Sequence, residues 1–501
     1  MKTRSGDYFF YLAATLAPRF AMFILLILLT RWLPVAQYGL FVLVVTVGEI
    51  LDTALTNWIR IYSLRTEAGL NGLRPLRLGR LLVLSGGATT LGVGLSWIVA
   101  RLTEPNETFV FWVALVSYTV GLGLVRFSIV LLQLAKRHSA IAVVEGVRAV
   151  AILVAVVAAA DMTHSYFAPS LALSLASGLV AGVQLVLTLR SLARPKLPKV
   201  GYMAALRFGF PLIVTALLTW VMTWFDRLVI NHYAGAAAVG LYAAAYAIGR
   251  QPIELFIAPL NSYTFPMLVR RYAAEGAAAA GRFQAGMLVT TCVLCVGAAA
   301  CISVLDVQLA GLLLPPAYRE HAVALLPSIT YGAVMISAKF FVFDNAFYTV
   351  KRNDLYLISM GAPAVVGAVT SILMISRWGI DGAGMSFVVT TSLSTLSSYV
   401  LSNRVLPMRL PVGRIAAVLA SAAAASAALA VAETWFETWH YAAQLCFGGA
   451  LFGLAYMAAL SLFGVSLRGV LMAPWEQSGQ EPTAASPNVG GAPAAAMGGK
   501  A

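Results

Sequence analysis

The sequence predicts an all-α integral membrane protein with about fourteen transmembrane helices. Hydrophobic residues make up 60% of its 501 residues and charged residues only 11%, whereas soluble globular domains average about 25% charged residues. The apolar residues form long blocks, and blocks of about 18 or more are typical of transmembrane helices. Basic residues gather in every second connection between the blocks. These observations together fix the fold class that we expect.

The apolar blocks give the positions of the predicted helices. The first block is too long for the apolar core of a cleavable signal peptide, and it holds Arg19 near its middle, so we expect a retained membrane helix. With ends placed to within about 2–4 residues, the predicted spans are 8–32, 39–60, 80–100, 109–134, 140–160, 168–190, 207–229, 239–261, 284–304, 322–348, 355–376, 382–402, 413–432 and 441–465.

Basic residues orient these helices in the membrane. Cytoplasmic connections of membrane proteins carry an excess of Lys and Arg, which predicts that both termini are cytoplasmic. The net charge of +14 then reflects membrane topology, and we expect no nucleic-acid partner. The outer side holds only Arg31, Arg101, Arg319 and Arg377, and most other basic residues lie in or beside the inner connections 61–79, 135–139, 191–206, 262–283, 349–354 and 403–412.

A repeated glycine spacing indicates two related halves. Gly39 and Gly48 of the second predicted helix correspond to Gly240 and Gly249 of the eighth, 201 residues later. Both helices follow an outer connection, so the halves are expected to be parallel repeats of six helices around a central cavity. The predicted organisation is an N-terminal lobe (1–200), a C-terminal lobe (201–410), two appended helices (411–466) and a disordered cytoplasmic tail (467–501).

Motifs for soluble chemistry are missing from the sequence. It has no Gly-rich phosphate-binding loop ending in Gly-Lys-Ser/Thr and no H-E-x-x-H pair. Cys292 and Cys295 form a C-x-x-C inside an apolar helix without a nearby histidine, so we interpret them as packing residues. We therefore predict no cofactor, no metal and no catalytic residue, and a protein that is not an enzyme.

Charged residues at membrane depth are the main candidates for function. Each costs about 2.5–3.5 kcal/mol on insertion scales, so such residues usually face a cavity or a partner. This chain retains Arg19, Glu49, Asp52, Arg126, Glu145, Arg148, Asp226, Arg227, Arg250, Glu254, Lys339 and Asp344 at that depth.

Some of these charges have partners nearby in sequence. Glu145 and Arg148 are three residues apart, and Arg250 and Glu254 are four apart, spacings that bring side chains together on one helix face. Mutual neutralisation and a functional role both stay open for such pairs.

Other charges differ in their surroundings. Asp226 and Arg227 lie near the expected outer membrane edge, which favours an interfacial anchor or a contact between lobes. Glu49 and Asp52 share a helix face without a basic residue close in sequence. Arg19 and Lys339 likewise lack a local partner, so these last four are the stronger functional candidates.

Four segments resemble a known family. They are 207–212 (RFGFPL), 224–230 (WFDRLVI), 239–246 (VGLYAAAY) and the glycine turn 378–384 (WGIDGAG). These segments are similar to those of bacterial polysaccharide flippases, whose superfamily also contains multidrug exporters and the peptidoglycan-precursor flippase. The resemblance extends over roughly residues 8–465, and fourteen helices fit the lipid-linked flippases better than the twelve usual in drug exporters.

The resemblance implies a transport function in the bacterial inner membrane. Such proteins move undecaprenyl-pyrophosphate-linked oligosaccharides from the inner to the outer leaflet by alternating access, for O-antigen, capsule or exopolysaccharide assembly. It implies a lipid-linked oligosaccharide as substrate, the lipid bilayer as surroundings, and a polysaccharide polymerase and a chain-length regulator as candidate partners.

Candidate roles follow from the charge of each residue. Arg binds phosphate as a bidentate donor and Lys as a point charge, so we expect substrate binding by Arg19, Arg126, Arg148, Arg250 and Lys339. We expect coupling or gating by Glu49, Asp52, Asp226 and Glu254. One hypothesis follows from the repeat: Glu49 and Arg250 occupy equivalent positions and hold each other when the cavity is empty.

Two alternatives to a flippase stay open at this point. A cation-coupled multidrug exporter predicts an acidic cavity, but the charges at membrane depth are evenly split between acidic and basic residues. A membrane polysaccharide polymerase usually needs a large outer loop, and the longest outer connection here, 305–321, is short.

Overall fold

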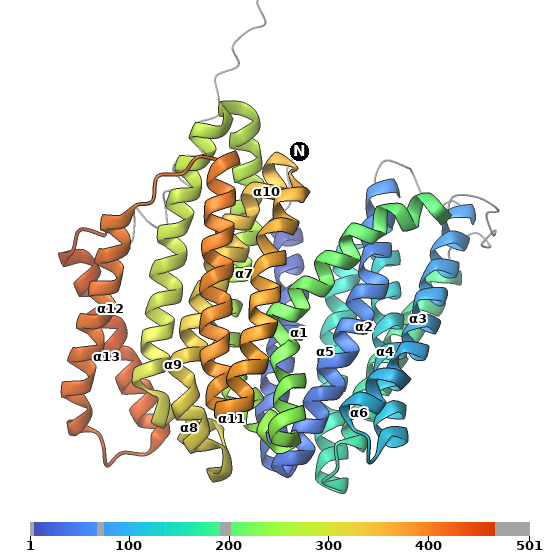
Figure 1. Ribbon diagram of the computed structural model, residues 1–501, viewed down its shortest axis with the longest axis horizontal. Coiled ribbons are helices and arrows are strands. Elements are labelled where there is room, and N and C mark those ends of the chain that lie inside the picture. The colour runs from blue at the N-terminus through green and yellow to red at the C-terminus, as the bar shows by residue number, and fades with distance from the viewer. Residues whose placement is uncertain (1–4, 68–74, 136, 191–201, 466–501) are drawn as a thin grey trace, which may run out of the picture.

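The computed structural model describes residues 5–67, 75–135, 137–190 and 202–465, and these ranges are almost entirely helical, without strands (Figure 1). Within them, ten helical runs are long and apolar enough to cross a membrane. The predicted all-α, multi-pass membrane fold is thereby confirmed. The predictions made for 191–201 and for the tail at 467–501 fall outside the described residues.

Six helices form the first group, drawn from blue to green in Figure 1. Helix α4 packs on α2, α3 and α6, and α1 packs on α5. The helices are α1 (Ser5–Trp32), α2 (Val35–Glu67), α3 (Pro75–Thr103), α4 (Thr108–Leu134), α5 (His138–Thr163) and α6 (Phe167–Arg190).

The rest of the chain forms a second group. Helix α7 is the main contact of this group with the first, since it packs on α2 as well as on α9 and α11. The elements are α7 (Tyr202–Val304), α8 (Asp306–Leu313), α9 (Pro316–Ala338), the π-helical turn η1 (Lys339–Phe343), α10 (Asp344–Val350), α11 (Asn353–Val405), α12 (Val412–Ala432), the 3₁₀ turn η2 (Glu433–Trp435) and α13 (Tyr441–Leu462).

Three glycines with positive φ form turns within the two longest helical runs. Gly235 and Gly276 adopt φ values of 81° and 80° within α7, and Gly379 adopts 56° within α11. Side chains larger than glycine's rarely tolerate these conformations. The turns divide α7 into three stretches that contain the predicted spans 207–229, 239–261 and 284–304. The total of fourteen spans stays a prediction.

The chain turns at Gly276, inside the expected connection 262–283, but the flanking helices extend past their predicted ends at 261 and 284, because the residues on both sides of Gly276 are helical. They form a hairpin that projects beyond the neighbouring helices at the top of Figure 1. Alanine, which has the highest helix propensity, dominates residues 273–280. Helix α2 likewise runs on to Glu67, into the predicted connection 61–79. Hydropathy indicates the part of a helix that lies in the membrane and not the full length of the helix.

The glycines of the repeat bring the two groups into contact at one end. A Cβ atom on Gly39 would lie 1.8 Å from the carbonyl oxygen of Ala236, and one on Gly240 would lie 2.4 Å from that of Val35. An apolar cluster with members from both groups, including Tyr38 and Tyr318, surrounds this contact. The predicted outer end is therefore closed by packing.

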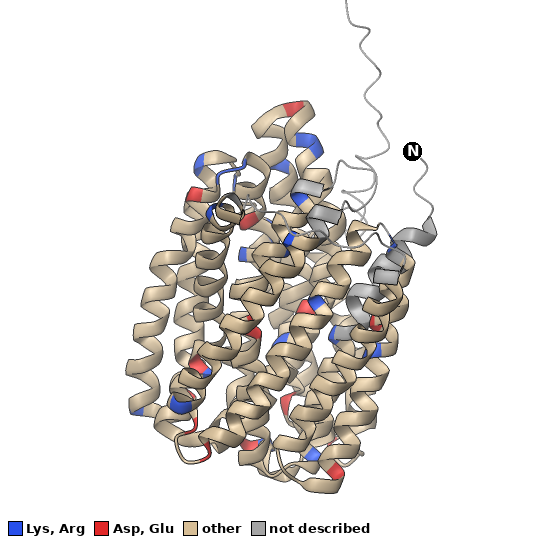
Figure 2. Ribbon diagram, turned by 90° about the vertical axis from the view of Figure 1, so that its right-hand side faces the viewer, with Lys and Arg blue, Asp and Glu red and all other residues tan. Residues whose placement is uncertain are grey.

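Charges are distributed along the helix axis in the way a membrane protein requires. Figure 2 shows Lys and Arg gathered toward the upper end and only isolated charged residues along the middle of the helices.

Candidate substrate cavity

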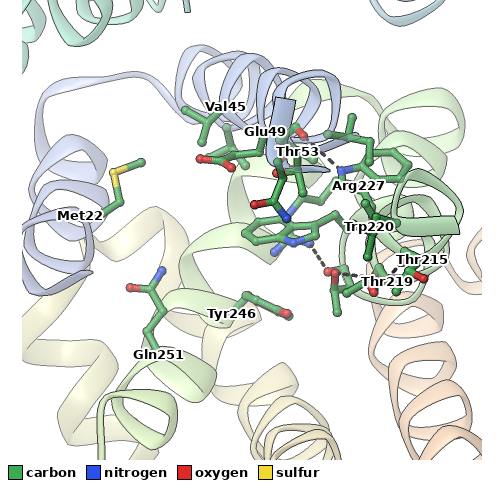
Figure 3. A pocket seen from close by; sticks show the side chains of 18 of the residues that line it. Met22, Val45, Glu49, Thr53, Thr215, Thr219, Trp220, Arg227, Tyr246 and Gln251 are labelled. Carbon is green, nitrogen blue, oxygen red and sulfur yellow. Dashed lines mark hydrogen bonds between the residues drawn. The ribbon is translucent and has the colours of Figure 1, made fainter. Parts of the chain in front are cut away.

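A cavity of about 660 Å³ lies between the two groups of helices. We call it the central cavity, and its volume is within the range of ligand sites, about 300–1,000 Å³. Helices α1 and α2 form one wall, and α7, α10 and α11 form the other (Figure 3). It extends toward Asn353, at the end of the molecule that holds connection 349–354. Its polar and aromatic lining residues are Thr46, Glu49, Thr53, Asn57, Thr215, Thr219, Trp220, Thr223, Trp224, Arg227, Tyr246, Gln251, Tyr348, Asn353 and Tyr356.

Arg227 is held on the α7 wall by aromatic rings and a carboxylate. Its guanidinium carbon lies 4.3 Å from the ring centroids of both Trp224 and Tyr246, and its Nη1 is 3.0 Å from Oδ1 of Asp226. Tyr242 donates a 2.6 Å hydrogen bond to the other oxygen of Asp226. Both charged residues are buried, which contradicts the interfacial anchor expected at 226–227. The other expectation, a contact between lobes, stays a prediction.

A second cavity of about 360 Å³ lies within the first group of helices. We call it the arginine chamber, because Arg19, Arg60, Arg126 and Arg148 line it. Met22 and Glu49 line both the arginine chamber and the central cavity, so the two spaces adjoin. Three of the five predicted substrate-binding residues, Arg19, Arg126 and Arg148, are thus brought together from α1, α4 and α5.

Arg126 is the partner of both acidic residues on α2. Its Nη2 lies 2.9 Å from Oε2 of Glu49, and its Nε forms an ion pair with Asp52, which is buried. Tyr118 donates a 3.2 Å hydrogen bond to Glu49, and Thr56 donates a 2.8 Å bond to Asp52. As expected, their basic partner is not close in sequence, because it comes from α4, more than 70 residues along the chain.

The predicted neighbours on single helices do pair. Nε of Arg148 lies 3.2 Å from Glu145, and Nη2 of Arg250 lies 2.6 Å from Glu254. Neither Arg250 nor Glu254 lines either cavity. Glu49 and Arg250 therefore each bind a residue of their own group of helices, which contradicts the hypothesis that they hold each other.

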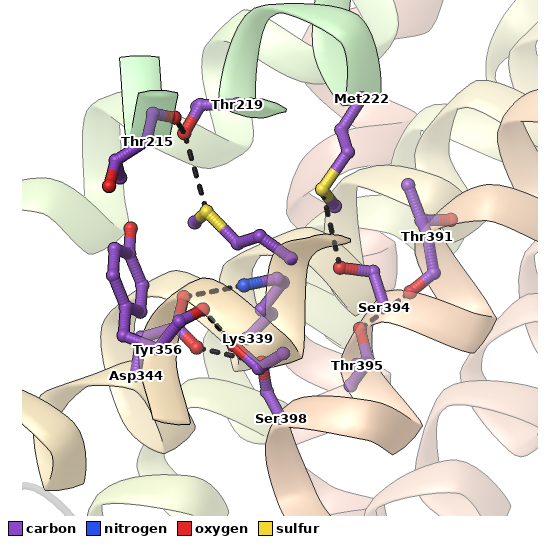
Figure 4. A network of polar contacts seen from close by, with 12 residues as sticks. Thr215, Thr219, Met222, Lys339, Asp344, Tyr356, Thr391, Ser394, Thr395 and Ser398 are labelled. Atoms are coloured by element: carbon purple, nitrogen blue, oxygen red, sulfur yellow. Dashed lines mark hydrogen bonds and ion pairs between the residues drawn. The ribbon is translucent and has the colours of Figure 1, made fainter. Parts of the chain in front are cut away.

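Lys339 and Asp344 form a fully buried pair behind the wall of the central cavity (Figure 4). Nζ of Lys339 is 2.7 Å from Oδ2 of Asp344, and Ser398 donates a 2.8 Å hydrogen bond to the other carboxylate oxygen. The expectation that Lys339 has no local partner is wrong. The π-helical turn, with its hydrogen bonds between residues five apart, brings positions 339 and 344 together. Lys339 also lies 5.6 Å from the ring of Tyr356, which lines the central cavity.

Sequence reasoning missed most of the uncharged lining. Trp220, Tyr246, Tyr356, Gln251 and Asn57 all face the central cavity. Aromatic and amide residues are common at every depth of a membrane protein, so no pattern in the sequence separates these from packing residues. Arg60 of the arginine chamber was placed among the inner basic residues, because it ends a predicted span.

Solved structures of similar fold are transporters. "Lipid II flippase MurJ, inward closed conformation" has a TM-score of 0.75 at 12% identity, covering 90% of this chain and 98% of that one. An inward-facing multidrug resistance MATE family transporter of the MOP superfamily has a TM-score of 0.59 at 13% identity, covering 78% and 97%. A MOP superfamily transporter from Pyrococcus furiosus has a TM-score of 0.56 at 13% identity, covering 82% and 94%.

These likenesses show the fold alone, because all three identities are low. Among curated protein sequences, none matches the chain. The sequence profile of a family described as "Polysaccharide biosynthesis protein" matches residues 6–271, which is more than half of the chain and includes all of the arginine chamber. The chain is therefore a multi-pass membrane protein that belongs to the polysaccharide biosynthesis protein family.

Proposed function

We propose that the protein flips an undecaprenyl-pyrophosphate-linked oligosaccharide from the inner to the outer leaflet of the bacterial inner membrane, by alternating access. The observation that carries this proposal is the adjacency of the two cavities. A lipid-linked sugar joins a compact anion to a larger polar headgroup. The arginine chamber fits the anion, and the central cavity beside it fits the sugar.

The arginine chamber has the chemistry that a pyrophosphate requires. Guanidinium groups give paired hydrogen bonds to phosphate oxygens. Arg126 and Arg148 keep 26% and 15% of their side chains exposed despite their ion pairs, and Arg19 is exposed. An entering pyrophosphate therefore meets accessible donors. We assign substrate contacts to Arg19, Arg126 and Arg148, and gating to Glu49 and Asp52, whose carboxylates compete with the phosphate for Arg126.

Arg250 and Lys339 take supporting roles in this proposal. Both are buried against their own carboxylates, at Glu254 and Asp344. Asp226 similarly fixes Arg227 beside the central cavity. These three pairs support the residues of the cavity wall, such as Tyr246 beside Arg250 and Tyr356 beside Lys339, instead of binding the phosphate directly.

Export of an anion needs no nucleotide hydrolysis. The cell interior is electrically negative, and moving one charge through the membrane potential releases about 2.3 kcal/mol per 100 mV. A pyrophosphate-linked sugar moving outward gains from this field. The polysaccharide polymerase and chain-length regulator expected as partners would then act on the sugar in the outer leaflet, during O-antigen, capsule or exopolysaccharide assembly.

The multidrug exporter is the weaker alternative, because the charged lining of the arginine chamber is four arginines against Glu49. Such a lining repels cationic drugs. The deciding experiment is deletion of the gene in its host, with mass analysis of lipid-linked oligosaccharides and assay of surface polysaccharide. We expect loss of polymer and accumulation of undecaprenyl-linked repeat units on the inner leaflet. Normal polymer with altered sensitivity to cationic drugs would contradict the proposal.

Complementation tests the site itself. Arg148→Gln, and Arg19→Gln separately, should restore little polymer although each protein is present in the membrane. Arg377→Gln is the matched control, because Arg377 is exposed and lines neither cavity. Full complementation by the chamber variants would show that the pyrophosphate binds elsewhere.

A further inference from the structure

The central cavity contains almost no available charge. Only Glu49 and Arg227 among its lining residues are charged, and both are already paired, with Arg126 and Asp226 respectively. Arg227 is 1% exposed, and its guanidinium faces are covered by aromatic rings. Among the described residues that line this cavity, a ligand therefore finds no free cation.

Uncharged polar groups and flat rings take the place of charges. Threonine hydroxyls from α2 and α7 and the amides of Asn57 and Gln251 offer neutral hydrogen-bond donors and acceptors. Trp220, Tyr246 and Tyr356 add aromatic surface. The C–H face of a sugar ring packs on such a surface, while its hydroxyls form hydrogen bonds with neutral polar groups.

We infer that the saccharide part of the substrate is uncharged, so that the pyrophosphate is its only anionic group. This inference rests on the proposed function and narrows its substrate class. A sugar carboxylate in the central cavity would lose its water without gaining a cation, and a buried charge without a partner is strongly unfavourable. Glu49, with 38% of its side chain exposed, would repel it further.

Trp220 is the residue best placed to orient the sugar. Its indole Nε1 donates a 3.2 Å hydrogen bond to the backbone carbonyl of Thr46, on the opposite wall. The ring is half-buried and so keeps surface for a ligand. Figure 3 shows it beside Thr215 and Thr219, which lie on the same helix and also line the cavity. One fixed ring with hydroxyls next to it matches the two faces of a neutral pyranose.

The test compares two substrates that differ in one group. The purified protein is reconstituted in liposomes, and flipping is measured for undecaprenyl-pyrophosphate carrying a neutral hexose oligosaccharide and for its analogue with one uronic acid. We expect the neutral substrate to move at least about tenfold faster, the ratio that corresponds to about one unpaired polar contact. Equal rates would overturn the inference, whereas failure to flip either substrate would reject the proposed function itself.

Two variants connect the preference to the cavity. Thr219→Lys supplies the missing cation, so the rate for the acidic substrate should rise relative to the neutral one; an unchanged ratio would overturn the inference.

Trp220→Ala should slow the neutral substrate about tenfold or more, and Trp220→Phe should retain part of the rate because it keeps a ring. Trp435→Ala is the control, since Trp435 is 76% exposed and lies outside both cavities. Equal rates for Trp220→Ala and this control would remove Trp220 from the site.

Discussion

Nζ of Lys339 lies 2.7 Å from Oδ2 of Asp344, although the two residues are five positions apart on one helical run. Neither side chain is accessible to solvent. In an α-helix, neighbours on one face are three or four residues apart. The π-helical turn at Lys339–Phe343 changes this register and creates the pair. A buried ion pair is sensitive to the loss of one partner.

Replacing Lys339 by Met should therefore destabilise the protein. The carboxylate of Asp344 would keep its hydrogen bond from Ser398 but lose its counter-ion. Removing one partner of a buried pair costs about 3–5 kcal/mol, which thermal unfolding in detergent would detect. The double variant Lys339→Met/Asp344→Asn should recover most of the loss, because no unpaired charge remains.

The control for this pair is Ser398→Ala. It removes one hydrogen bond to the carboxylate, which is worth about 1.5–3 kcal/mol, and leaves the ion pair in place. It should destabilise less than Lys339→Met. If the double variant were as unstable as Lys339→Met alone, loss of packing and not the unpaired charge would explain the effect.

Gly39→Ala should open the predicted outer end. Its Cβ would lie 1.8 Å from the carbonyl oxygen of Ala236, a backbone atom that cannot rotate away. The contact between α2 and α7 must then separate. A cysteine introduced at Val45, which lines the central cavity, should react faster with a membrane-impermeant maleimide added from outside. The background carries Cys446→Ser, because that thiol is exposed.

Gly94→Ala is the matched control for this change. Gly94 also lies in a membrane helix, but nothing is within 4 Å of its Cβ position. Labelling at Val45 should stay at the level of the unsubstituted background. Equal labelling in the Gly39 and Gly94 variants would mean that the glycine contact does not close the outer end.

Double-mutant cycles should show whether Glu49 pairs with Arg126 or with Arg250. Glu49→Gln and Arg126→Gln remove the two ends of a 2.9 Å ion pair, so their effects on the free energy of unfolding should couple by about 0.5–3 kcal/mol. Glu49→Gln and Arg250→Gln should be additive, because Arg250 binds Glu254. Strong coupling in the second cycle would restore the idea of a contact between the repeats.

Gly235→Ala should destabilise the turn within α7 by backbone strain alone. Nothing lies within 4 Å of its Cβ position, but φ and ψ of 81° and 171° belong to a region that is essentially restricted to glycine. The expected cost is about 1–3 kcal/mol. Gly286→Ala, in the same helix with equally open space and no positive φ, should be neutral or stabilising by thermal unfolding. Equal effects of both changes would argue against strain.

Pairs of charges show how far the sequence predicts this site. Glu145–Arg148 and Arg250–Glu254 follow from helix periodicity, and both form. The pairing of Arg126 with Glu49 joins two helices, and the spacing of residues in the sequence does not predict it. Arg19, Arg126 and Arg148 were candidates by charge and depth, but only the packing of α1, α4 and α5 brings them into one chamber.

The sequence by itself determined the membrane fold and the position of most helices, because each depends on an apolar block long enough to cross a bilayer. The turn at Gly379 was expected from the resemblance of residues 378–384 to the polysaccharide flippases. The tertiary structure alone decided which charges on different helices pair, how the π-helical register joins Lys339 to Asp344, and which uncharged side chains line the central cavity. These features depend on contacts between segments far apart in sequence or on a local change of helical register, and neither hydropathy nor residue spacing encodes them.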